Sequence, residues 1–185
     1  SALTKVASLY RALIPTSTTA RTDFNLLFGS NIQATGTVTG ADLTVLFNTV
    51  GDPNFNQAGL LASLPKAASL FTALKSSAAN LADFNLLHGT NIASTGNLSA
   101  TNRSFIFGVA AAGGYVQASY LSALTKTAAL YRTLQGNSGL LSNFNALYAS
   151  SVTATGTPSA ANRSILFAVA GDPGYVQSNF VAILP

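Results

Sequence analysis

The sequence predicts an all-α protein of three tandem helical repeats of about 60 residues, and three observations lead to this prediction. Phe24-Asn25, Phe84-Asn85 and Phe144-Asn145 lie 60 residues apart, and self-similarity at a fixed period indicates a repeat architecture. Apolar residues recur with helical spacing in each copy. Strict alternation, which the strands of a β-solenoid would need, never lasts beyond a few residues.

The repeats are expected at residues 1–65, 66–125 and 126–185, with about four short helices each, stacked as an array or compact bundle. The opening phrase Ser1–Leu13 returns at 62–74 and 122–134, with one extra residue near Ile14-Pro15. We call positions related by this period equivalent positions. The sequence ends in register with Pro65, and it contains no Met. Three units of a longer array, or three units that close on themselves, are both consistent with this register, and the missing Met indicates a removed leader or a longer product.

The first helix of each repeat is predicted from a stripe of apolar residues one helical face wide. In the first copy the stripe is Val6, Leu9, Tyr10 and Leu13. The second helix is expected to follow an N-cap residue at Ser17, Ser77 or Asn137. Its apolar face in the first copy consists of Phe24, Leu27, Phe28 and Ile32. A Thr/Gly segment follows, where Gly36, Gly96 and Gly156 predict a turn with positive φ.

The third helix is predicted from a capping box in the first copy, where Thr39 would cap and Asp42 would stand at N3. Ser99 with Asn102 and Ser159 with Asn162 repeat this arrangement. Its apolar face in the first copy would be Leu43, Leu46, Phe47 and Val50. The fourth helix is expected to begin with Asp52 as N-cap and Pro53 at N1, and Asp172-Pro173 repeats this pattern. Pro65 and the Thr125 region would connect it to the next repeat.

Composition excludes several classes of protein. Charged residues make up 8% of the chain, against about 25% in ordinary soluble proteins, while 48% is hydrophobic, so a dispersed cytosolic monomer is not expected. Without Cys there are no disulfides or zinc–thiolate sites. The net charge of +4 is too diffuse for a nucleic-acid groove. The longest apolar run, Phe105 to Ala112, is too short to span a membrane.

No residue pattern predicts catalysis, a cofactor or a metal site, so we expect no enzyme. His88 is the single histidine and occupies the position of Phe28 and Tyr148, which favours a structural role. The five Asp residues are scattered and do not form a calcium loop.

Three sets of polar residues are candidates for structural or interface roles. Asn25, Asn85 and Asn145 lie inside predicted helices, where Asn is unfavourable. We expect them to form buried hydrogen bonds between helices that fix how units dock, and an exposed polar ladder for another chain or a glycan is the alternative. Lys5, Lys66 and Lys126 would be solvated at unit junctions or make intermolecular contacts. Asn97, Asn102 and Asn162 match the N-glycosylation pattern, which leaves carbohydrate attachment open.

Two resemblances point to extracellular structural material. The phrase Leu9–Leu13, echoed at Leu130–Leu134, resembles the opening helix of helical repeats in some bacterial secreted and surface-layer proteins. This chain lacks the Gly-Arg turn, the Asp-containing loop and the Trp that usually follow. The composition is similar to that of the helical repeat domains of spider silks.

These observations predict an extracellular or cell-surface structural repeat protein that self-assembles into a filament, sheath, surface layer or fibre. Its partner would be another copy of itself, with a glycan or the cell surface as a further partner. We expect head-to-tail contacts in which the face around Leu184 meets the Val6, Leu9 and Leu13 stripe of a neighbour. A helical binding module that carries a lipid or pigment is the alternative.

Overall fold

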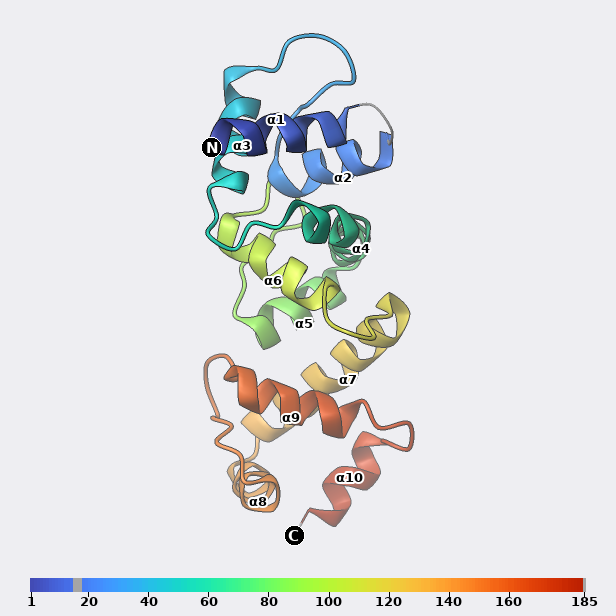
Figure 1. Cartoon of the computed structure of the whole chain (residues 1–185). Coiled ribbons are helices and arrows are strands. Elements are labelled where there is room, and N and C mark those ends of the chain that lie inside the picture. The colour runs from blue at the N-terminus through green and yellow to red at the C-terminus, as the bar shows by residue number, and fades with distance from the viewer. Residues whose placement is uncertain (15–17, 185) are drawn as a thin grey trace. The chain divides into compact units, whose positions relative to one another are not determined.

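The fold is all-α, as predicted. The computed structural model describes residues 1–14 and 18–184, which form ten helices and no strand. The helices, drawn in Figure 1, are α1 (Ala2–Leu13), α2 (Thr18–Phe28), α3 (Gly40–Val50), α4 (Gln57–Ser76), α5 (Ala78–His88), α6 (Ala100–Ala110), α7 (Gln117–Gln135), α8 (Ser138–Tyr148), α9 (Ala160–Ala170) and α10 (Gln177–Ile183).

The chain divides into two compact units, each with its own set of packed helices. The first unit is Ser1–Ala73 with Thr95–Gly114, and it contains α1, α2, α3, α6 and most of α4. The second is Leu74–Ser94 with Tyr115–Pro185, and it contains α5 and α7 to α10. The predicted boundaries after residues 65 and 125 do not coincide with this division, and the domain boundaries stay a prediction.

In the first unit, α1 packs against both α3 and α2. The apolar stripe of α1 is buried: Val6, Leu9 and Leu13 are at most 4% exposed. From α3, Leu46 and Val50 enter the same core. The helical period of these side chains therefore predicted the buried face of α1 correctly.

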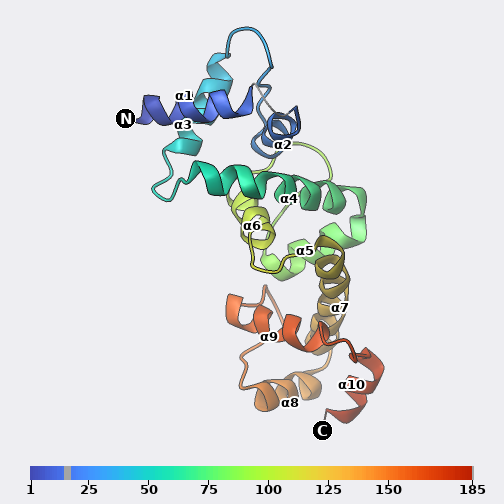
Figure 2. The same cartoon turned by 45° about the vertical axis from the view of Figure 1, so that its right-hand side comes forward.

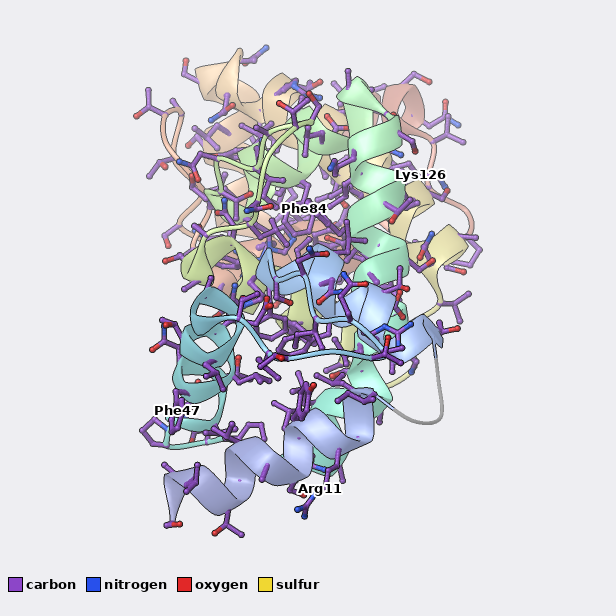
Figure 3. The ribbon with its side chains drawn as sticks, turned by 90° about the horizontal axis from the view of Figure 1, so that it is seen from above. Arg11, Phe47, Phe84 and Lys126 are labelled. Carbon is purple, nitrogen blue, oxygen red and sulfur yellow. The ribbon has the colours of Figure 1, made fainter. Side chains whose placement is uncertain are left out.

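In the second unit, α7 is the central helix and packs against α5, α8 and α9. Tyr131 of α7, Phe84 of α5 and Phe144 of α8 are the largest side chains of this core, each without exposed surface. Phe84 is labelled in Figure 3. Helices α8 and α10 lie on the same side of α9 in both Figure 1 and Figure 2.

Helices α4 and α7 are longer than the sequence pattern predicts. The predicted fourth helix of one repeat continues without a break into the first helix of the next, so both Pro65 and Thr125 lie inside helices. Proline removes one backbone hydrogen bond from a helix interior. In α4 the neighbouring Leu64, Ala67 and Ala68 are buried, and this packing offsets the loss.

The predicted start of the fourth helix is wrong. The Asp52 carboxylate accepts a hydrogen bond from the Asn54 backbone N–H at 2.7 Å, and Asp172 does the same with Gly174 at 2.7 Å. Each Asp therefore stabilises an Asx-turn, in which its side chain accepts from the backbone N–H two residues later. The helix begins later, at Gln57 in the first copy and at Gln177 in the last.

The predicted start of the third helix is confirmed. Thr39, Ser99 and Ser159 each accept a hydrogen bond from the backbone N–H three residues later. Ser77 and Asn137 cap the second helix as predicted, whereas Ser17 lies outside the described residues. Gly36, Gly96 and Gly156 have φ of 101°, 84° and 82°, which confirms the predicted turns.

Candidate functional site

The three equivalent Asn residues each hold the loop that follows their own helix. Asn25 Nδ2 donates to the Ile32 carbonyl at 2.9 Å, while its Oδ1 accepts the Ile32 N–H at 3.0 Å. Ser30 Oγ donates to the same Oδ1 at 2.7 Å. Asn85 and Asn145 make the same three kinds of bond, with partners at 90 and 92 and at 150 and 152.

This geometry corrects the expectation that the Asn residues join different helices. The amide acts as a local clamp: it gives a loop without regular structure the partners that its backbone groups require. The side chains are half-buried, so they are neither a core network nor an exposed ladder for recognition.

A second clamp holds the same loop from the other side. Asp42 Oδ2 accepts from the Thr39 hydroxyl at 2.7 Å, and its Oδ1 accepts from the Asn31 N–H at 2.8 Å. In the last copy, Asn162 Oδ1 accepts from the Ser151 N–H at 3.2 Å. The clamps fix α3 to α2 and α9 to α8, so the orientation of these third helices is well defined. Asn102 and Asn162 are 6% exposed, and carbohydrate could not be attached to either without opening the folded site.

Three predicted interface residues on α1 and one near the chain end lie in the interior. Val6, Leu9 and Leu13 pack inside the first unit, and Leu184 is 7% exposed. A neighbouring chain cannot contact side chains that are already buried within one unit of the same chain. The predicted head-to-tail contact between Leu184 and the Val6, Leu9 and Leu13 stripe is therefore wrong. Lys5 and Lys66 are exposed and Lys126 is half-buried; Figure 3 shows Lys126 on α7.

The aromatic end of α2 is covered by a third helix in the first unit. The Arg103 guanidinium of α6 lies over the Phe28 ring, 4.2 Å from its centroid, and the Phe107 ring lies 6.0 Å from Phe28. The arginine position allows a cation–π attraction with the face of the ring. Leu27, beside Phe28, is 0% exposed.

In the second unit the equivalent Arg and Phe residues of α9 contact α5 and the start of α7. Arg163 of α9 donates to the Leu87 carbonyl of α5 at 3.3 Å, and the Phe167 ring lies 5.8 Å from Tyr120. Leu87 is 0% exposed. His88 stacks on Phe84 and its Nε2 lies 2.9 Å from the Tyr120 hydroxyl.

Burial and, to a smaller extent, the nearby Arg163 charge together lower the pKa of His88 from 6.5 to about 3. Burial also raises the pKa of Tyr120 above its usual range. Both side chains are therefore neutral near pH 7, which fits a packed aromatic position and not an acid–base site.

The equivalent surface of α8 is open. Tyr148, Tyr175 and Phe180 form an aromatic cluster, with Phe180 6.3 Å from Tyr148 and 5.6 Å from Tyr175. Gln177 Nε2 donates to Thr133 at 2.7 Å and so fixes the start of α10 against α7. The cluster lines a groove of about 640 Å³ between α8, α9 and α10. Its other apolar lining residues are Ile165, Ala168, Val169, Val176 and Ile183.

The leucine before the last residue of α2, α5 and α8 shows how the open surface of α8 differs from the covered surfaces of α2 and α5. Leu147 is equivalent to Leu27 and Leu87, yet it is 62% exposed. On α3, Leu43 and Phe47 are 39% and 40% exposed, whereas they were predicted to face the core. They are equivalent to Arg103 and Phe107, the side chains that cover α2.

Among residues 1–14 and 18–184, no three His, Asp or Glu side chains gather where they could hold a metal ion. Within the same ranges, no helix has the length and hydropathy needed to cross a membrane. No protein-family model matches the chain, and searches of curated proteins and of solved structures find no match.

Proposed function

We propose that this protein is a non-enzymatic structural protein of three tandem repeats of about 60 residues, whose copies self-assemble into a filament, sheath, surface layer or fibre. We place it outside the cell or on the cell surface, because its few charges and its apolar composition suit an assembled material better than a dispersed monomer.

One observation supports the proposal most strongly. Leu27 and Leu87 are 0% exposed, whereas the equivalent Leu147 is 62% exposed and its neighbour Tyr148 lines an apolar groove of about 640 Å³. Burial of apolar surface contributes roughly 25 cal/mol per Å², so association that covers this groove would be favourable. Self-association through a surface that resembles an internal junction would extend the array from chain to chain.

Sedimentation velocity over a wide concentration range tests this function. We expect species at multiples of 18.9 kDa that grow with concentration. A single 18.9 kDa species at every concentration would contradict it.

The groove also supports a second function, a binding module for an apolar ligand. Its volume lies within the roughly 300–1,000 Å³ typical of ligand pockets. The Tyr175 hydroxyl at its edge is buried and has no hydrogen-bond partner among the described residues, so it could donate to a ligand's polar end. Native mass spectrometry of protein from its source tests this function. A monomer that carries an extractable lipid or pigment would favour it over assembly.

A further inference from the structure

We infer that helix α3 of a second copy of this chain occupies the groove beside α8 and α10, so that chains add head to tail. The inference rests on the proposed self-assembly and specifies its interface. Two surfaces would meet in this contact. The groove surface consists of Leu147, Tyr148 and Phe180 with their neighbours. The α3 surface consists of Thr37, Leu43 and Phe47.

The chain itself contains this contact twice. In the first unit, Arg103 and Phe107 of α6 cover Phe28 of α2. In the second unit, Arg163 and Phe167 of α9 cover Leu87 and Tyr120. In both cases a third helix contacts the C-terminal end of the second helix of the preceding repeat, and in the second unit it also contacts Tyr120 of α7.

Among the described residues, one surface of each kind is not covered by such a contact. The groove surface has the same positions as the covered surfaces, since Tyr148 is equivalent to Phe28 and His88, and Phe180 is equivalent to Tyr120. The α3 surface has the same positions as the covering helices, since Leu43 is equivalent to Arg103 and Phe47 to Phe107. Leu147, Leu43 and Phe47 are exposed, whereas Tyr148 and Phe180 are half-buried; Phe47 is labelled on α3 in Figure 3. Continuity with the two internal contacts therefore identifies the occupant as a second copy.

The chemistry of the two surfaces is complementary. The arginine of the internal contacts is replaced by Leu43, and the groove surface presents aromatic and aliphatic side chains to it. Leu43 and Phe47 would thus leave water for a mostly apolar groove, whose polar lining residues include Asp172 and Asn179.

The loops before α6 and α9 show which residues would lie next to each other across the proposed interface. A Cβ placed on Gly89 would lie 3.4 Å from Thr157 Cβ, and one on Gly29 would lie 3.2 Å from Asn97 Cβ. The equivalent pair across the proposed interface is Ala149 and Thr37. Ala149 has its Cβ where the others have none, so Thr37 must shift by a few tenths of an ångström to fit.

A polar contact accompanies the internal junction in the second unit. Arg132 of α7 forms an ion pair with Asp83 of α5 at 2.6 Å. Across the proposed interface the equivalent pair is Arg11 and Asn143. Arg11 is exposed and points away from α1 in Figure 3. This pair allows a gain of affinity to be designed.

The first turn of α1 and the end of α10 have equivalent positions in the period, which sets one condition on docking. Ala2 and Leu3 at the start of α1 are equivalent to Ile183 and Leu184. An exact continuation of the period would bring these segments to the same place. Leu3 is 67% exposed, so the first turn of α1 can move aside. A chain without residues 1–4 should therefore associate at least as tightly as the full chain.

The first experiment uses charged substitutions on the two surfaces. Phe47→Asp removes the α3 surface and Leu147→Asp removes the groove surface, both at exposed positions that the fold tolerates. Val116→Asp, at a position 58% exposed and outside both surfaces, is the matched control. Circular dichroism checks that each variant keeps its helicity, and sedimentation velocity measures association.

The expected results follow from the heterologous geometry. Each surface variant alone should be monomeric, and the control should assemble like the wild type. A mixture of Phe47→Asp with Leu147→Asp should form a heterodimer and stop there, since only one intact pair of surfaces remains. Asn143→Asp should tighten association up to about fivefold at low salt, and Arg11→Ala should abolish that gain.

The second experiment traps the contact covalently and does not depend on variants that lose affinity. The chain contains no Cys, so Thr37→Cys and Ala149→Cys are clean single-thiol variants. Disulfides need Cβ atoms about 3.5–4.5 Å apart, close to the Gly89–Thr157 spacing. Oxidation of the mixture with a glutathione redox buffer should give the mixed disulfide in preference to either homodimer.

The outcomes separate the interface from the function. The proposed interface would be wrong if the wild type assembles and the surface variants assemble equally well. It would also be wrong if the mixture stays monomeric and forms no mixed disulfide. In either case the proposed self-assembly would not be contradicted. A wild type that never associates would overturn both. Binding of an extracted lipid in place of a second chain would assign the groove to the ligand-carrying function.

Discussion

His88 lies in a buried aromatic position that disfavours its charged form. Its ring stacks on Phe84 with 4.3 Å between centroids, its Nε2 lies 2.9 Å from the Tyr120 hydroxyl, and the positive charge of Arg163 acts against protonation. These surroundings lower the pKa of His88 from 6.5 to about 3. The unfolded chain therefore binds a proton between these two pH values that the folded chain does not.

The sign and size of the effect follow from this difference. Burial of His88 in its neutral form makes its pKa lower in the folded chain than in the unfolded chain. The folded chain therefore loses stability as pH falls through the interval between the two pKa values. With one pKa unit equivalent to about 1.36 kcal/mol, the free energy of unfolding should fall by about 2 kcal/mol between pH 7 and pH 5. The loss should reach about 4 kcal/mol near pH 3.

Urea unfolding of the wild type and of His88→Phe at several pH values tests this prediction. Phenylalanine is the residue at the equivalent position 28, where it stacks on Phe24 at 4.2 Å. The substitution leaves the Tyr120 hydroxyl without His88, which lowers stability at every pH, so the slope with pH is the readout. Burial raises the pKa of Asp23, which gives a slope of opposite sign that both proteins share. Equal slopes between pH 7 and pH 5 would refute the reasoning.

Three further predictions follow from the clamps, the core and the absence of a predicted metal site. Asn85→Leu should lower the free energy of unfolding by about 1–3 kcal/mol, because it leaves the buried groups of the Ile92 loop unpaired; amide exchange that stays slow at Ile92 would argue against the clamp. Leu9→Asp should unfold the first unit and not merely disperse an assembly, since Leu9 has no exposed surface; a variant with wild-type helicity and melting temperature would contradict this. Addition of a chelator should leave the melting temperature unchanged, and a fall of several degrees would reveal a metal site.

The helical periods and cap residues were sufficient to predict most of the local structure. A residue at the right spacing, such as Leu9 or Leu70, is buried because the helix has one face to bury. Thr39 and Ser159 cap their helices because their side chains satisfy backbone groups a few residues away. These interactions are local in sequence, and local patterns report them well.

The pattern failed where local signals compete. Asp52 followed by Pro53 reads as a helix start, but the same side chain can close a turn with the backbone two residues later, and the turn is what forms. Pro65 reads as a junction, but packing of its neighbours keeps α4 continuous. In the first case a local hydrogen bond, and in the second the packing of neighbouring side chains, decided between two local structures that the sequence allows.

The candidate site could not be predicted from the sequence, because it depends on which neighbour each position has. Leu27, Leu87 and Leu147 are the same residue at equivalent positions, and only the last is exposed. Leu43 and Phe47 fit an apolar stripe, yet their counterparts Arg103 and Phe107 face another helix, not the core of their own. A comparison of the three copies does carry one signal: the position that is Arg in the second and third copies (Arg103 and Arg163) is Leu43 in the first.

That difference between the copies also determines how strong the proposed interface should be. The internal contact in the second unit has the hydrogen bond from Arg163 to the Leu87 carbonyl and the ion pair of Arg132 with Asp83. The proposed interface has Leu43 and Asn143 in the places of Arg163 and Asp83. Without these two polar contacts, chains should separate before their helices unfold. Dilution or mild urea should therefore lower the sedimentation coefficient while the helical circular dichroism signal stays constant. Loss of both signals at the same urea concentration would mean that a chain does not fold stably without its neighbour, and the contact between chains would then be as strong as the contacts within them.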